Sequence, residues 1–187
     1  MAIRKQNLAQ TITQIATSVA LMAVCSWISV PFFISFTMQS FGVFFISALM
    51  GWKKSVLAML VYIALGICGA PVFSGFQSGA AHLAGATGGY IISFPVVALI
   101  IGVLCRLLGD RIPLLMLSML IGIAVCYIAG TLWYVFGYTR SDSTYSFLSV
   151  LSYCVFPFII PDILKSFLAA FLIRRIKPYI AKHAQHS

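Results

Sequence analysis

The chain has 187 residues, of which 61% are hydrophobic and 8% are charged. Because soluble domains carry about 25% charged residues, this composition excludes a soluble protein and indicates an integral membrane protein. The net charge of +9 does not indicate a nucleic-acid-binding surface, because the basic residues stand in short clusters between apolar runs and glutamate is absent.

Six apolar segments predict an all-α protein with six transmembrane helices in one membrane domain, residues 1–187. A membrane-spanning helix needs about 20 apolar residues. We expect the spans at about residues 11–30, 40–51, 55–69, 89–108, 113–136 and 147–173. The second and third segments are short for full spans, so we expect either extension by flanking residues or packing around a thinner, cavity-containing core.

The first span follows Arg4 and Lys5, as the apolar part of a signal peptide would. The run is longer than that of a signal peptide and no A-x-A cleavage site ends it, so we expect it to be retained. Within it, Ala16 and Ala20 stand four residues apart, and small residues at this spacing let another helix approach closely. From the sequence alone, packing within the bundle and contact with another protein explain this face equally well.

Residues 70–88 break the pattern of apolar spans. They are rich in glycine and alanine, contain Pro71 and carry no charge. Irregular backbone at membrane depth is tolerated only where it is buried in protein or lines a cavity. We therefore expect this segment to lie against the body of the protein rather than in lipid.

The basic residues are distributed unequally between the two sides of the predicted membrane domain. One side, which holds both termini, receives Arg4, Lys5, Lys53, Lys54, Arg106, Arg111, Arg174, Arg175, Lys177 and Lys182. The other side receives only Arg140. Because cytoplasmic loops carry the excess of lysine and arginine, we expect both termini to be cytoplasmic.

The last span contains two charges, Asp162 and Lys165. Asp162 precedes Arg174 by 12 residues, which is about 18 Å along a helix. Both charges should therefore lie in the middle or outer half of a hydrocarbon core about 30 Å thick. At a spacing of three residues they share one helical face and can meet. We expect Pro161 in the first turn of the helix, with Asp162 near its N-terminus.

A buried ion pair that only neutralises itself would explain the two opposite signs. It would not explain why charges are present, because an apolar pair would be less costly at this depth. We therefore interpret the pair as an acceptor and a donor for a polar ligand. Other polar residues and a glycine that allows close backbone approach map to the same outer end: Thr37, Gln39, Gln77, Ser78, His82, Thr87, Gly88 and Tyr90. Their placement predicts a pocket that opens outward.

The sequence offers little for catalysis or metal binding. The five cysteines form no CxxC pair and lie in or at the end of apolar runs, so we interpret them as buried hydrophobic residues. One intramembrane carboxylate and His82 are too few ligands for a metal. Ser74 and His82 share a loop as nucleophile and base would, but nothing in their spacing favours that alternative. We expect no enzyme activity, no metal and no cofactor.

Four blocks of the sequence, in order, resemble the BioY family: FTMQSFGVFFISALMG (36–51), YIALGICGAPVF (62–73), GATGGY (85–90) and PDILKSFLAA (161–170). BioY proteins are the substrate-binding S-components of biotin transporters of the energy-coupling factor (ECF) type. The resemblance covers about residues 31–175. In the third block the family usually has proline where this chain has Ala86.

This resemblance implies a six-helix S-component bundle in the cell membrane that captures biotin from outside, with the loop at residues 70–88 capping the pocket. It implies that Asp162 accepts hydrogen bonds from the ureido N–H groups of biotin. Lys165 would donate to the ureido oxygen or offset the charge of Asp162. The remaining binding residues that it implies are Thr37, Gln39, Thr87, Gly88 and Tyr90.

The resemblance also implies partners. The face with Ala16 and Ala20 would dock on the transmembrane coupling protein of the transporter. ATP hydrolysis would belong to a partner ATPase pair, because this chain has no GxxxxGK[ST] phosphate-binding loop. Biotin is then a transported substrate and not a cofactor. Two alternatives stay open: an S-component for another vitamin, and an intramembrane enzyme or structural subunit without a transport role.

Overall fold

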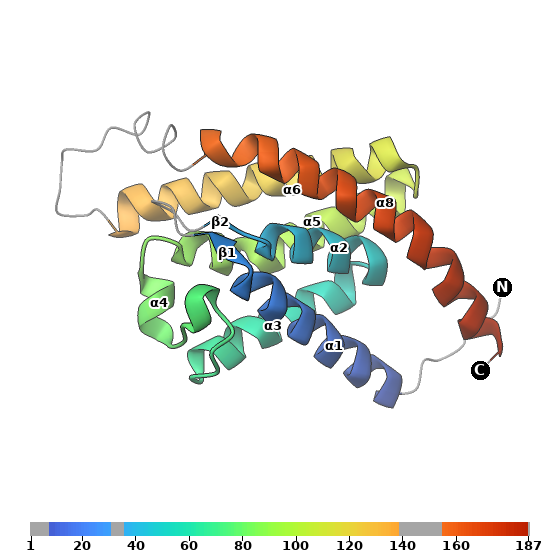
Figure 1. The fold of residues 1–187 in the computed structure, drawn as a ribbon, viewed down its shortest axis with the longest axis horizontal. Helices are drawn as coiled ribbons and strands as arrows, with labels where there is room; N and C mark the ends of the chain where they lie inside the picture. Colours follow the sequence, from blue (N-terminus) through green and yellow to red (C-terminus); the bar gives the residue numbers. More distant parts are fainter. Residues whose placement is uncertain (1–7, 31–35, 139–154, 187) are drawn as a thin grey trace.

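The computed structural model describes residues 8–30, 36–138 and 155–186, and its fold there is almost entirely helical (Figure 1). The helices are α1 (Leu8–Trp27), α2 (Gln39–Met50), α3 (Trp52–Ile67), α4 (Ala80–Ala84), α5 (Gly88–Leu108), α6 (Ile112–Trp133) and α8 (Phe156–His186). A 3-10 turn covers Ser74–Phe76, and α6 continues into a π-helical turn, Tyr134–Tyr138. Two short antiparallel strands, β1 (Ser29–Val30) and β2 (Phe36–Thr37), pair Ser29 with Thr37.

Four helices in the described part of the chain are long and apolar enough to cross a membrane. They are α1, α5, α6 with its π-helical turn, and α8 as far as Tyr179. Helix α2 has 12 residues, which is only about 18 Å of helix, and α3 has 16. Both coincide with segments that are short in the sequence, and their crossing of the membrane stays a prediction.

Helix α8 differs from the prediction at its start. It begins at Phe156, and residues 147–154 of the predicted span lie outside the described residues. Pro157, not Pro161, occupies the first turn, where the missing N–H is not needed. Pro161 is inside the helix, at the cost of one backbone hydrogen bond. The prediction that Asp162 lies near a helix N-terminus is therefore wrong.

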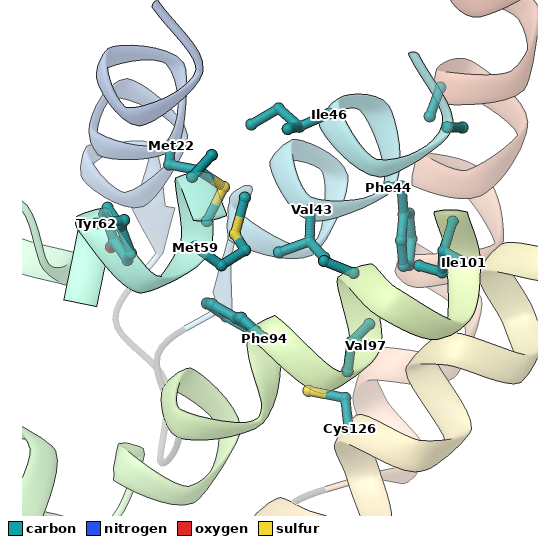
Figure 2. Close-up of a cluster of buried hydrophobic side chains, with 14 of the residues drawn as sticks. Met22, Val43, Phe44, Ile46, Met59, Tyr62, Phe94, Val97, Ile101 and Cys126 are labelled. Carbon is teal, nitrogen blue, oxygen red and sulfur yellow. The ribbon is translucent and has the colours of Figure 1, made fainter. Parts of the chain in front are cut away.

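Helix α2 lies at the centre of the bundle, where it contacts α1, α3, α5 and α8. A helix enclosed on all sides needs apolar or small side chains on every face, and QSFGVFFISALM supplies them. Val43, Phe44 and Ile46 of α2 belong to one buried cluster with Met59 of α3 and Ile101 of α5, as Figure 2 shows. This cluster holds the N-terminal end of α2 in a fixed position beside α5 and α8.

With the exception of Lys165, the described basic residues gather at one end of the bundle. The N-terminal end of α1, the C-terminal end of α8 and the α5–α6 turn all lie on the right of Figure 1. At this end Lys54 Nζ donates to Gln14 Oε1 at 2.7 Å, and Lys177 pairs with Asp110 at 2.5 Å. We call it the basic end. The clustering of these described residues is thus a property of the folded chain. The positions of Arg4, Lys5 and Arg140, which lie outside the described residues, and the side of the membrane that the basic end faces stay predictions.

The described cysteines are all free. Cys25, Cys105 and Cys126 are buried, as expected of small hydrophobic side chains. Cys68 is exposed, because α3 ends at Ile67 and the chain turns away there, so the interpretation as a buried residue is wrong for Cys68. Cys154 lies outside the described residues.

Candidate functional site

A cavity lies between α2, α5, α6 and α8, remote from the basic end. It holds about 580 Å³ of space between atoms, part of it open to the outside. Its lining residues are Thr37, Gln39, Ser40, Thr87, Tyr90, Ile91, Phe94, Ile123, Cys126, Tyr127, Phe158, Asp162 and Lys165. Largely apolar walls with a few convergent polar groups are typical of small-molecule sites. The structure therefore brings six of the seven predicted ligand-binding residues to one cavity.

Asp162 and Lys165 form the polar end of this cavity. Lys165 Nζ lies 2.9 Å from Asp162 Oδ1. Asp162 is 4% exposed and Lys165 is 6% exposed. The spacing of three residues within α8 places both side chains on one helical face, as the sequence predicts. The pair is electrically neutral as a unit, so burial costs less than it would for either charge alone.

The ammonium group of Lys165 holds the start of α2 against α8. Besides Asp162, it donates to the backbone oxygen of Thr37 at 2.7 Å and to Ser40 Oγ at 3.0 Å. An ammonium group has three donors, and these three acceptors account for all of them. Lys165 would have to release one of these partners in order to donate to a ligand.

Asp162 has a larger set of partners than the sequence indicates. Its Oδ1 accepts from Ser40 Oγ at 2.8 Å as well as from Lys165, and its Oδ2 accepts from the Tyr127 hydroxyl at 2.5 Å. A carboxylate offers about four acceptor positions, so it retains capacity toward the cavity. Sequence reasoning missed Ser40 and Tyr127. For Ser40 the available signal was its place beside Gln39. Nothing in the predicted span 113–136 distinguishes Tyr127, since Tyr134 lies in the same span.

A chain of hydrogen bonds leads from the cavity to the loop after α3. Thr37 Oγ1 donates to Gln39 Oε1 at 3.0 Å, and Gln39 Nε2 donates to the Tyr62 hydroxyl at 2.8 Å. The Tyr62 hydroxyl in turn donates to the Val72 oxygen at 2.8 Å. Ser26 Oγ also donates to that oxygen, at 2.5 Å. The side-chain amide of Gln39 thus accepts through Oε1 and donates through Nε2, which fixes its orientation at the cavity.

We expect Tyr62→Phe to lower the free energy of unfolding by about 1–3 kcal/mol, because Tyr62 is fully buried and its loss leaves Gln39 Nε2 without its acceptor. Thermal unfolding of the purified protein in detergent measures the change. Tyr179→Phe is the matched control, since Tyr179 is 69% exposed. Equal stability of the two variants would show that the hydrogen-bond chain does not stabilise the fold.

Residues 70–88 pack against the end of α3. The Phe73 ring lies on Gly66, where a Cβ would come within 2.1 Å of it, and stacks on the His82 ring at 5.1 Å between centroids. His82 Nδ1 lies 2.5 Å from Gln77 Oε1, and burial lowers the pKa of His82. Gln77 and His82 thus take part in the packing of this segment and do not line the cavity. Within the described residues, Ser74 makes no hydrogen bond with His82.

Gly88 is the predicted binding residue that does not line the cavity. A Cβ at Gly88 would lie 1.6 Å from the Leu83 backbone oxygen, so glycine lets α4 pack onto the start of α5. Its neighbours Thr87 and Tyr90 do line the cavity. The Tyr90 ring lies across Gly130 of α6, where a Cβ would fall 2.3 Å from it. The structure gives both glycines a packing role that sets the position of Tyr90.

The fold defines a multi-pass membrane protein, and its cavity has the size and lining that suit a small molecule. The sequence model of the BioY family matches residues 2–182, and the chain belongs to this family. The predicted family membership is confirmed, and the protein is located in the cell membrane.

Relatives and a solved structure agree with this assignment. The probable biotin transporter BioY of Pyrococcus horikoshii is 36% identical over 172 residues, 90% of this chain and 97% of the relative. The biotin transporter BioY of Thermotoga maritima is 33% identical over 84% of this chain and 90% of its own length. The crystal structure of the S-component for biotin from an ECF-type ABC transporter aligns with a TM-score of 0.82, at 24% identity over 95% of each chain. At that identity the likeness shows the fold.

Proposed function

We propose that this chain captures biotin from outside the cell and is the substrate-binding S-component of an ECF-type transporter. Family membership, the names of the relatives and the S-component fold support this function. The observation that carries it is the buried Asp162–Lys165 pair in the wall of a largely apolar cavity. Such a site suits one end of a ligand that has a small polar ring, an apolar middle part and a carboxylate at its other end.

The ureido ring of biotin is the end that suits Asp162. One of its two N–H groups can donate to the remaining acceptor position of the carboxylate in a charge-assisted hydrogen bond. The second can donate there once Ser40 or Tyr127 releases its bond to Asp162. The carboxylate of biotin suits this position less, because Lys165 already donates to three protein acceptors and Asp162 would repel a second anion. We therefore orient the ureido ring toward α8, with Thr37, Gln39, Thr87 and Tyr90 completing the polar contacts.

The apolar part of biotin would lie against the apolar wall of the cavity. Ile91 and Phe94 of α5 and Ile123 of α6 line that wall. Burying apolar area contributes roughly 25 cal/mol per Å², so these contacts add affinity without hydrogen bonds. We include Gly88 in the site only through its support of Thr87 and Tyr90.

We further propose that the chain forms one membrane domain with six spans and that both termini are cytoplasmic. The gathering of basic residues at one end of the bundle supports this orientation, because that end would be retained in the cytoplasm. The cavity then lies toward the outside, where it can receive its ligand.

The chain itself has no phosphate-binding loop, so we assign ATP hydrolysis to a partner ATPase pair and docking to a transmembrane coupling protein. Ala16 and Ala20 are exposed on α1. Their small side chains allow a helix of another protein to approach this face closely. We therefore propose this face as the contact with the coupling protein.

Ala16→Leu combined with Ala20→Leu is expected to reduce biotin uptake by cells with the complete transporter roughly tenfold, equivalent to about 1.4 kcal/mol. Biotin binding by the purified chain should be unchanged, because neither alanine lines the cavity. Ala64→Leu, at an exposed alanine of α3, is the control. Normal uptake by the double variant would place the docking surface elsewhere.

A titration of the purified protein with biotin, riboflavin and thiamine tests the proposed function. We expect saturable binding of biotin alone. Binding of another vitamin without biotin would make the chain an S-component of different specificity. Absence of saturable binding of any of the three would favour an intramembrane protein without a transport role.

A further inference from the structure

A second cleft lies at the basic end of the bundle, between the α5–α6 turn and the C-terminal half of α8. It is lined by Asp110, Arg111, Ile173, Arg174, Lys177 and Pro178. Three cations face one carboxylate, which leaves a surplus of two positive charges in this cleft. None of these residues belongs to the candidate biotin pocket.

The charges of this cleft are only partly engaged by the protein. Lys177 pairs with Asp110, but their side chains are 41% and 49% exposed, and exposed pairs contribute roughly 0–1 kcal/mol. Neither the Arg111 nor the Arg174 guanidinium makes a hydrogen bond or an ion pair with the described part of the chain. Two guanidinium groups that are free to turn into one cleft can bind a phosphate through paired N–H donors.

The cleft lies at the level where the apolar parts of two helices end. Helix α6 begins at Ile112, directly after Arg111, and the apolar run of α8 ends at Ile173, directly before Arg174. Ile173 is fully buried and supplies an apolar floor. Tyr179, 69% exposed one to two turns further on, is of the type that is enriched at the membrane–water interface. In a bilayer, the phosphates of lipid head groups lie at this level.

We propose that this cleft binds the phosphate of an anionic phospholipid head group from the leaflet that the basic end faces. Arg111 and Arg174 hold the phosphate, while Lys177 contributes charge at the rim. Ile173, which is fully buried, closes the floor of the cleft beneath the phosphate. A lipid is favoured over a soluble anion because the cleft lies where head groups are concentrated and because basic pockets between spanning helices suit them.

Bound lipid can be counted by native mass spectrometry of the protein released from nanodiscs of phosphatidylglycerol or phosphatidylcholine. We expect the unmodified protein to retain phosphatidylglycerol and not phosphatidylcholine. Arg111→Gln combined with Arg174→Gln should reduce retention at least tenfold. The control is Lys53→Gln combined with Arg106→Gln, which also removes two positive charges from the basic end, but outside the cleft. This control variant should retain the lipid.

Biotin binding by the cleft double variant should equal that of the unmodified protein, which shows that the variant is folded. Equal retention of phosphatidylglycerol by the two double variants would overturn the proposal, as would equal retention of the two lipids. Displacement of the lipid by millimolar inorganic phosphate would identify a site for free phosphate instead. A cross-link from the cleft to a partner protein that excludes lipid would identify a protein contact.

Discussion

Asp162→Asn is expected to weaken biotin binding at least tenfold, a loss of about 1.4 kcal/mol or more. The substitution preserves the size of the side chain but replaces one acceptor oxygen by an N–H₂ donor, which faces the ureido donors of the ligand. It also removes the charge that strengthens hydrogen bonds to Ser40, Tyr127 and Lys165. A biotin titration of the purified variant measures the effect.

Asp110→Asn is the matched control, because it makes the same chemical change at the opposite end of the bundle. Biotin affinity should be unchanged in this variant. Equal affinity of Asp162→Asn and the unmodified protein would mean that the buried pair serves the fold and not the ligand.

Lys165→Met is expected to lower the free energy of unfolding by about 3–5 kcal/mol, because it leaves a buried carboxylate without its cation. The variant also loses the bonds to the Thr37 oxygen and Ser40 that hold the start of α2 against α8. Denaturant or thermal unfolding in detergent measures the loss.

The double variant Asp162→Asn, Lys165→Met separates stability from binding. Removing both charges should recover most of the lost stability, because no uncompensated charge is then buried. Biotin binding should not recover, because the acceptor for the ureido ring is still absent. A Lys165→Met variant that is as stable as the unmodified protein would contradict the account of the pair.

Much of the helical pattern follows from the sequence, because apolar runs and their interruptions are local signals. The boundary between α2 and α3 is an example: Gly51, with a φ of +76°, separates an apolar run from Trp52 and two lysines. The start of α8 could not be predicted as well. Pro157 and Pro161 carry the same sequence signal for the first turn of a helix. The turn that begins at Phe156 places Phe158 in the cavity wall, and this contact with other helices is not visible in the local sequence.

The polar end of the cavity could be predicted by the depth of the charges and by the polar ends of the other segments. Tyr127 could not. Helix α6 is apolar on nearly every side, so its sequence has no periodicity that indicates which face meets α8. Gly88 shows a different limit, since a glycine that admits a ligand and one that admits a neighbouring helix are identical in sequence. Only the position of Leu83 distinguishes the two.

The structure of the protein with biotin bound tests the central claim most directly. We predict biotin in the cavity between α2, α5, α6 and α8, with at least one ureido nitrogen about 2.7–3.2 Å from an Asp162 carboxylate oxygen. Biotin bound away from this cavity, or with its carboxylate instead of its ureido ring against Asp162, would contradict the account.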